Sequence, residues 1–304
     1  MSGAVEFHLF LPQIRLTPEA LKARARAAEA AGFTGLAVMD HLFPPGAADR
    51  PMYEALTTVT WLAAFTEELR LGHLVLCDSF RHPAVLARQA VTLDHLSGGR
   101  FELGIGSGST PGELASFGFP PLSAAQRVER LGETLDLLGK FWSGETVDHE
   151  GAFFRVQGAR QLPVPLHHIP IVVGGTGPRT MALVAEYADW WNVPMHQTDR
   201  LAQARPGAGS ARVSVQLLVT LVGEESTRQD VVALAQRRFG QMSQGGHLVG
   251  RPDELLPRLA ELRDGGVERI YTWFTDFAGP DTLATFGREV ITALGPGSVG
   301  GGRP

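Results

Sequence analysis

The 304-residue sequence contains one cysteine, Cys77, and no long apolar run. A lone cysteine excludes an internal disulfide and a thiolate metal cage, and it is typical of a reducing cytosol. No apolar stretch approaches the ~20 residues that a membrane-spanning helix needs. The first residues, MSGAVEFHLFLPQ, lack the basic region of a signal peptide and resemble a buried strand. These absences predict a soluble, cytoplasmic protein.

An excess of charge of one sign is also missing. The chain has 27 basic and 32 acidic residues, a net charge of -5, and no segment that concentrates lysine and arginine. We therefore expect neither nucleic acid nor an anionic membrane as the main partner. Hydrophobic residues make up 44% of the chain, which allows a large core and excludes wholesale disorder.

Apolar, strand-like runs alternate with segments of helical period along almost the whole chain. There are eight strand candidates, most of them followed by a helix, and no shift in composition marks a domain boundary. Such alternation is typical of an α/β fold with a parallel sheet, and eight units favour a closed (β/α)8 barrel. We expect one barrel domain over residues 1–294 and a flexible, glycine-rich tail over residues 295–304.

Two segments interrupt this rhythm, and two helices carry informative residues. Residues 144–158, GETVDHEGAFFRVQG, predict a hairpin-like insertion between the fourth helix and the fifth strand. Residues 195–211 are too short and too rich in glycine and proline for a full crossover helix. Ser123 and Gln126 have the spacing of a capping box. Pro257 removes a backbone donor, so we expect a kink or a later start of its helix.

Four loops that follow strands carry unusual chemistry, and in a barrel they meet at one mouth. They hold the Asp40-His41 pair and the stretches CDSFRHP (77–83), GSGSTPGE (106–113) and GGTGPRT (174–180). Asp40-His41 is compatible with a metal pair, half of a proton relay, a cofactor contact or an ordinary polar loop. Nothing local to the dipeptide decides among these four.

The stretch IVVGGTGPRT is the best candidate for an anion site. Its glycines permit a sharp turn, and Pro178 near the first helical position leaves amide N–H groups at the positive end of a helix. Thr176 adds a hydroxyl and Arg179 a charge. The alternative is a tight turn that needs glycine for its dihedral angles alone. GIGSGS is a weaker signal, compatible with a ring or phosphate near the backbone or with plain turn chemistry.

Two other enzyme classes fit the residues poorly. A metal-dependent hydrolase on a barrel usually carries a His-Xaa-His pair on an early strand, which is absent here, as is an HExxH helix. His167 and His168 lie in a proline-rich loop, where solvent-facing side chains explain them. A serine nucleophile needs GxSxG spacing, which GIGSGS lacks. We therefore expect no metal site.

Several of these stretches together resemble the bacterial luciferase-like family of flavin- and deazaflavin-dependent oxidoreductases, especially its branch that uses coenzyme F420. The likeness covers nearly the whole chain. It is carried by MDHLF, by the long segment from LRLGHLVLCDSFRHP to GSGSTPGE, by GETVDHEGAFF, by PIVVGGTGPRTMALVAEYADWWN and by VGRPDELLPRLAELRDGGVERI. Residues 195–211 depart from the family pattern, because this segment is shorter than the corresponding segment expected in the family.

The resemblance implies a deazaflavin or flavin ring at the barrel mouth and its phosphate on the loop after the fifth strand. A non-proline cis peptide often lies behind the ring, and Leu74-Val75 is the matching step. Gly174, Gly175, Thr176 and Gly177 are expected to hold the phosphate, and Ser107 and Gly108 to approach the ribityl chain. Leu74 and Val75 are expected behind the ring, and Asp40 is expected to contact the cofactor.

The resemblance also assigns the candidate catalytic residues. His41 is expected beside the reacting carbon as the proton donor or acceptor, with Glu113 at a polar position beside the pocket and Glu54 at a helix position below it. A histidine suits this role because its proton exchanges near neutral pH. Trp190, Trp191 and Trp273 are candidates to line the mouth, although buried aromatic residues more often belong to the core.

Three functions follow from the resemblance. The first is hydride transfer between C5 of coenzyme F420 and a small organic substrate. The second is an FMN-dependent monooxygenase that uses O2 and a partner reductase, and the third is a flavin-binding protein without catalysis. The presence of Asp40, His41 and the pocket glycines argues against the third function, because a protein that had lost catalysis should have lost these residues first. The MDHLF loop favours F420 over FMN as the cofactor. We also expect a homodimer. The identity of the substrate is not readable from the sequence.

Overall fold

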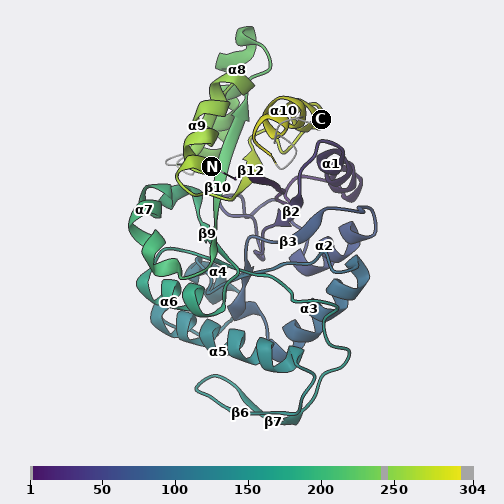
Figure 1. The fold of residues 1–304 in the computed structure, drawn as a ribbon, viewed down its shortest axis with the longest axis vertical. Coiled ribbons are helices and arrows are strands. Elements are labelled where there is room, and N and C mark those ends of the chain that lie inside the picture. Colours follow the sequence, from purple (N-terminus) through teal and green to yellow (C-terminus); the bar gives the residue numbers. More distant parts are fainter. Residues whose placement is uncertain (1–2, 241–245, 296–304) are drawn as a thin grey trace, which may run out of the picture.

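The computed structural model describes residues 3–240 and 246–295, and Figure 1 shows parallel strands ringed by helices. The strand order is β3-β2-β1-β12-β10-β9-β8-β5-β4, and all of these strands pair in parallel. Their bounds are β1 Glu6–Phe10, β2 Gly35–Val38, β3 Arg70–His73, β4 Leu76–Cys77, β5 Leu103–Gly106, β8 Ile171–Gly174, β9 Trp190–Val193, β10 Arg212–Leu221 and β12 Arg269–Phe274.

The strand path closes on itself, because β3 runs into β4 after a two-residue break. A bridge between Leu71 and Phe101 and the pairing of β4 with β5 join the first strand of the order to the last. β11 (His247–Gly250) pairs only with β10 and lies off this path. With β3 and β4 counted as one, eight strands form the barrel in the described part of the chain. The predicted (β/α)8 barrel is confirmed.

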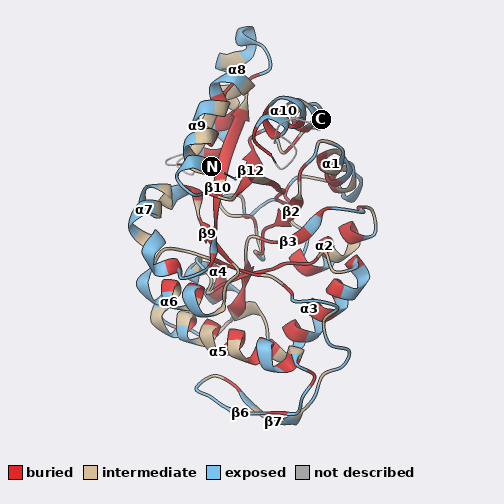
Figure 2. Ribbon diagram, in the orientation of Figure 1, coloured by how far each residue is buried: buried red, intermediate tan, exposed pale blue. Residues whose placement is uncertain are grey.

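Helices surround the barrel, and their buried faces point inward (Figure 2). The helices are α1 Pro18–Ala30, α2 Ala55–Ala63, α3 Pro83–Ser97, α4 Pro111–Ser116, α5 Ala124–Trp142, α6 Pro178–Tyr187, α7 Leu201–Ala204, α8 Arg228–Phe239, α9 Pro252–Asp264 and α10 Pro280–Phe286, followed by a π-turn at Gly287–Ile291 and α11 Thr292–Leu294. Among the described residues, no helix combines the length and apolar character that crossing a bilayer requires.

Local signals set several helix ends. The Ser123–Gln126 capping box is confirmed: the Gln126 N–H donates to Ser123 Oγ at 3.3 Å, and the Ser123 N–H donates to Gln126 Oε1 at 3.0 Å. α9 begins at Pro252 and contains Pro257, so a later start is wrong. A cap at the start of α9 explains this, since the Arg251 N–H donates to Glu254 Oε2 at 2.7 Å and fixes the first turn.

The predicted insertion is an antiparallel hairpin of β6 (Val147–Glu150) and β7 (Arg155–Ala159), which projects from the barrel in Figure 1. Glu133 of α5 ties it down by accepting hydrogen bonds from Phe153 N (2.9 Å) and Phe154 N (2.8 Å). Residues 195–208 contain only short turns and the four-residue α7, as the composition predicted. Of the predicted tail, residues 296–304 lie outside the described part.

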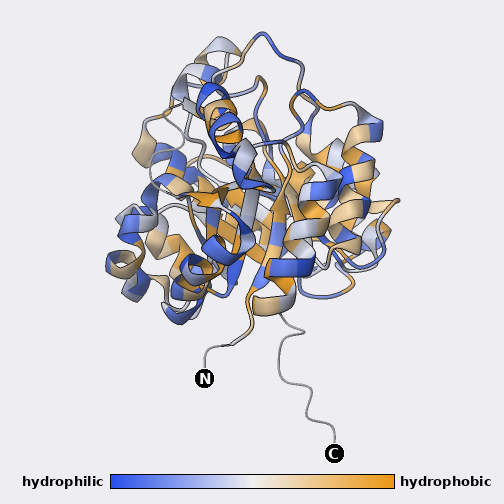
Figure 3. Cartoon of the chain, turned by 90° about the horizontal axis from the view of Figure 1, so that it is seen from above, coloured by the Kyte–Doolittle hydropathy of each residue, from blue (hydrophilic) through white to orange (hydrophobic). Residues whose placement is uncertain are grey.

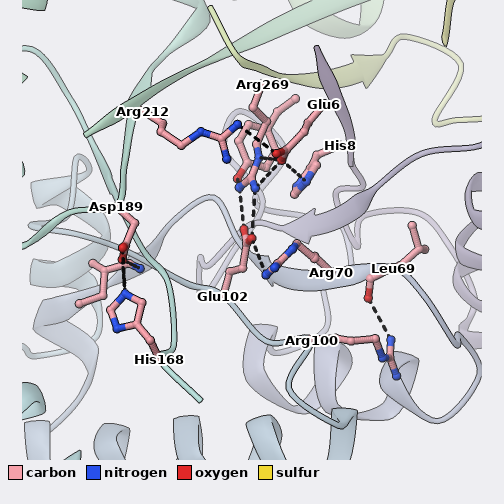
Figure 4. Close-up of polar contacts among 12 residues, drawn as sticks. Glu6, His8, Leu69, Arg70, Arg100, Glu102, His168, Asp189, Arg212 and Arg269 are labelled. Atoms are coloured by element: carbon pink, nitrogen blue, oxygen red, sulfur yellow. Dashed lines mark hydrogen bonds and ion pairs between the residues drawn. The ribbon is translucent and has the colours of Figure 1, made fainter. Parts of the chain in front are cut away.

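A buried charge network fills the end of the barrel where the strands begin (Figure 4). Arg269 is 1% exposed and donates to Glu6 Oε2 at 2.9 Å and to Glu102 Oε2 at 2.6 Å. Its guanidinium also lies 3.6 Å from the ring centre of Trp190. Trp190 therefore packs at this floor and not at the mouth. In such barrels the chemistry takes place at the opposite end, so we assign this charge network to stability and not to catalysis.

Apolar residues concentrate on the strands and on the inward faces of the helices (Figure 3). The main core fills the layer between barrel and helices and includes the fully buried Trp191. A second, smaller cluster contains Phe10, Met39, Met195 and Trp273, with Leu74 packed against it. These residues come from the ends of different strands, so the second cluster lies inside the barrel below its mouth.

Candidate active site

A cavity of about 300 Å³ opens at the carboxyl ends of the strands. All four loops singled out in the sequence contribute to it, as barrel topology requires. The predicted residues in its wall are Asp40, His41, Leu74, Val75, Ser107, Gly108, Glu113, Gly174 and Gly175. Thr176 and Gly177 follow directly in the chain but do not line this cavity.

The break between β3 and β4 shapes one wall of the cavity. The Leu74-Val75 peptide is cis, at the step that the family resemblance pointed to. Val75 then fills the space over the neighbouring strand: a Cβ on Gly106 would lie 2.8 Å from Val75 Cγ2. A Cβ on Gly104 would collide with the carbonyl oxygen of His73. The glycines of GIG are therefore needed for the close approach of the third strand, whatever binds above them.

Asp40 anchors the end of β2 to the loop after β4. Its carboxylate forms a two-pronged ion pair with Arg81, in which Arg81 Nη2 donates to Oδ1 at 2.9 Å. Oδ2 also accepts from the Cys77 N–H at 2.7 Å. Arg81 Nη2 also donates to Glu54 Oε1 at 3.1 Å. Both Asp40 oxygens thus have protein partners, and its contact with a cofactor stays a prediction.

His41 and Glu113 form the second polar pair of the cavity. His41 Nδ1 lies 2.8 Å from Glu113 Oε2, and Glu113 is 2% exposed. Glu113 Oε1 accepts from the N–H groups of Leu42 and Phe43, which holds the carboxylate against the loop. A carboxylate only accepts hydrogen bonds, so it favours the proton on Nδ1 and leaves Nε2 able to accept one. No described residue bonds Nε2.

The loop after β8 leads into α6 without a side-chain cap. Gly175 has a φ of 121°, which a residue with a side chain rarely adopts. Gly177 precedes Pro178 at the helix start, and no side chain accepts from the first-turn amides. Arg179 is exposed and forms no ion pair among the described residues. Uncapped amides, the helix dipole and a nearby cation together suit a phosphate.

Two side-chain amides on the cavity wall were not foreseen from the sequence. Asn192 of β9 is 3% exposed and donates from Nδ2 to Ser214 Oγ at 3.1 Å. Neither its Oδ1 nor the amide of Gln216 on β10 has a hydrogen-bond partner in the described part of the chain, and both residues line the cavity. Arg81 was missed as well, although the loop CDSFRHP was marked. For Asn192 and Gln216 the available signal was a polar residue inside an apolar strand.

In residues 3–240 and 246–295, no group of three or more His, Cys, Asp or Glu side chains is arranged to hold a metal ion. His167 and His168 do not join the cavity, and His168 instead pairs with Asp189 at 2.8 Å outside the barrel (Figure 4).

A sequence model of the family described as luciferase-like monooxygenase matches residues 5–216, well over half of the chain. The chain belongs to the luciferase-like monooxygenase family. Among its relatives, the F420-dependent glucose-6-phosphate dehydrogenase of Nakamurella multipartita is 33% identical over 218 residues, which are 67% of this chain and 62% of that protein. The F420-dependent hydroxymycolic acid dehydrogenase of Mycobacterium tuberculosis is 33% identical over 56% of this chain and 48% of its own length.

Solved structures agree on the fold of this luciferase-like protein. An F420-dependent secondary alcohol dehydrogenase in complex with an F420-acetone adduct superimposes with a TM-score of 0.82 at 16% identity, over 94% of this chain and 98% of the other. At that identity the likeness shows the fold alone. The luciferase-like chain spans about half to three-fifths of the length of the curated relatives that it matches.

Proposed function

We propose that this luciferase-like protein is a coenzyme F420-dependent oxidoreductase that transfers a hydride between C5 of the deazaflavin and a small organic substrate. The observation that carries the proposal is the His41–Glu113 pair, which leaves one imidazole nitrogen open at the wall of the cavity. The names of the 33% identical relatives support F420 as the cofactor.

The residues around the cavity fit such a cofactor. Ser107, Gly174 and Gly175 line the cavity with a small side chain or none, which allows a flat ring to approach the backbone closely. The open amides of Asn192 and Gln216 offer both donors and acceptors for the polar edge of a ring. The uncapped start of α6, with Thr176 nearby, would hold the phosphate.

Within this site the protein's own task is to move a proton. When bound, coenzyme F420 supplies hydride chemistry at C5 of its ring. In an alcohol oxidation the hydroxyl proton moves to Nε2 of His41, and in the reverse direction Nε2 returns it to the substrate oxygen. Glu113 stabilises the imidazolium that forms, because its buried carboxylate lies 2.8 Å from Nδ1.

A second candidate function has support of its own. The family's description as a monooxygenase favours FMN, O2 and a partner reductase that supplies reduced flavin. Titrating the purified protein with F420 and with FMN separates the two, with cofactor fluorescence as the signal. Tight F420 binding and weak FMN binding are expected, and the reverse would contradict the proposal. The homodimer stays a prediction, which light scattering on the eluted protein tests.

A further inference from the structure

A second hollow of about 50 Å³ is lined by none of the residues that line the active-site cavity. Met39 lines this hollow and belongs to the buried cluster against which Leu74 of the active-site cavity packs. Its volume corresponds to a few water molecules, so it admits a small chemical group and not a ring. Its lining includes Arg15, Met39, Arg238, Phe239, Trp273 and Phe277.

Two exposed arginines line this hollow, and neither forms an ion pair with a described residue. Arg15 follows β1 and forms neither an ion pair nor a hydrogen bond with any described residue. Arg238 of α8 donates to the carbonyl oxygen of Thr275 at 2.8 Å and lies 5.2 Å from the ring centre of Phe277. Burial, and after it the cation of Arg15, lower the pKa of Arg238. Two like charges held together without compensation attract an anion.

Asp276, the carboxylate whose charge acts on Arg238, has hydrogen-bond partners of its own. Asp276 raises the pKa of Arg238 by its charge, against the larger effect of burial. Its oxygens, however, accept from Ala278 N at 3.0 Å, from Gly279 N at 3.3 Å and from Thr282 Oγ1 at 2.6 Å. Asp276 therefore fixes the turn before α10 and forms no ion pair with either arginine.

An unsatisfied donor lies in the same wall. Trp273, at the end of β12, is 6% exposed, and its indole Nε1 has no hydrogen-bond partner among the described residues. A buried donor without a partner is costly, so such groups usually meet a ligand or water. Phe10 and Phe239 hold the indole edge-on, each with ring centres 5.1 Å away. Trp273 was only a candidate to line the mouth, and in the structure it lines this second hollow.

The backbone around the hollow is also unusual. Arg15 has a φ of 60° and Phe277 a φ of 61°, in the left-handed region that residues with a Cβ rarely adopt. Both residues line the hollow. Such conformations persist where the surrounding structure imposes them, often at ligand sites.

We propose that this hollow binds a compact anionic group, a carboxylate or a phosphate, of a small molecule whose apolar portion packs on Met39 and Phe239. Arg15 and Arg238 neutralise the anion, and Trp273 Nε1 donates a hydrogen bond to it. This anion site goes beyond the proposed function and does not depend on it.

The test compares hexanoate and hexyl phosphate with hexanol, titrated into the F420-loaded protein and into the protein without F420. Calorimetry gives the affinity, and tryptophan fluorescence reports on Trp273 by difference from Trp273→Phe. At least one of the two anions should bind more tightly than hexanol. Arg15→Gln and Arg238→Gln should each weaken anion binding at least about fivefold, and Arg238→Lys should retain most of it. Which anion binds identifies the group.

The matched control is Arg237→Gln, because Arg237 is exposed on α8 like Arg238 but does not line the hollow. This change should leave anion affinity unaltered. Equal affinity for the acids and hexanol, or equal losses at residues 237 and 238, would overturn the inference. F420 affinity, followed separately, should be the same in all these variants. Failure to bind F420 would reject the proposed function while the titration without cofactor still tests the hollow.

Discussion

His41, on the loop after β2, and Glu113, in α4 after β5, bring Nδ1 and Oε2 within 2.8 Å of each other across 72 residues of sequence. The pair joins the second and fourth units of the barrel at the cavity wall. The carboxylate is buried while the imidazole is partly open, so the charge that orients the ring is protected and the atom that handles a proton remains accessible.

Replacing Glu113 by glutamine should lower turnover while leaving F420 affinity nearly unchanged. The amide keeps the size of the carboxylate but removes the charge that stabilises an imidazolium at His41. We expect a loss of about 10- to 100-fold in kcat, since one assisted proton transfer contributes on the order of 10²–10⁴-fold. Glu129→Gln, an exposed change on α5, is the control. An unchanged kcat in the Glu113 variant would remove Glu113 from the proton step.

The Asp40–Arg81 pair should make a large contribution to stability. Arg81→Met leaves the Asp40 carboxylate buried without its cation, although the Cys77 N–H remains. Breaking a buried pair in this way costs about 3–5 kcal/mol. The double variant Asp40→Asn/Arg81→Met should be less destabilised than the sum of the two single changes. Urea unfolding of the four proteins measures the coupling, and strict additivity would show that the pair is not coupled.

Gly106→Ala should destabilise the barrel through the break in its third strand. The added Cβ would lie 2.8 Å from Val75 Cγ2, and crowding of this kind costs about 1–3 kcal/mol. Adding Val75→Ala removes the contacting methyl group and should recover part of the loss. Thermal unfolding of the single and double variants without cofactor is the measurement. If Gly106→Ala alone were as stable as wild type, the close approach would not be what requires glycine.

Stability should fall as the pH drops below about 6.5, in part because of His73. Burial lowers the pKa of His73 from 6.5 to about 4, so the folded state binds its proton less readily than the unfolded state. Its stabilising effect is complete above the unfolded pKa and is lost as the pH falls from 6.5 towards 4. The whole effect amounts to about 3 kcal/mol. His73→Leu should flatten this part of the curve in urea unfolding, and an unaltered slope would contradict it.

Features decided within a few residues were predictable from the sequence. The Ser123–Gln126 cap needs only its own turn, and the convergence of the four loops follows from barrel topology. The start of α9 was misjudged because the Arg251–Glu254 cap outweighs the breaking tendency of Pro257.

Pairings set by tertiary structure were not predictable in the same way. Arg81 reaches Asp40 only after β2 and β4 are placed together, and the amides of Asn192 and Gln216 enter the cavity only after the strand register is set. Trp190 and Trp191 are adjacent in sequence, yet one packs on Arg269 at the floor and the other donates to the Gly175 carbonyl at 2.7 Å.

The most direct test of the central claim is the effect of His41→Ala on F420 binding and on turnover. F420 affinity is measured by fluorescence titration, and turnover is followed as loss of oxidised F420 with a substrate found in a panel of alcohols. The account predicts an affinity within about twofold of wild type and a kcat at least about 100-fold lower. An unchanged kcat at equal affinity would contradict it and return His41 to an ordinary place in the loop.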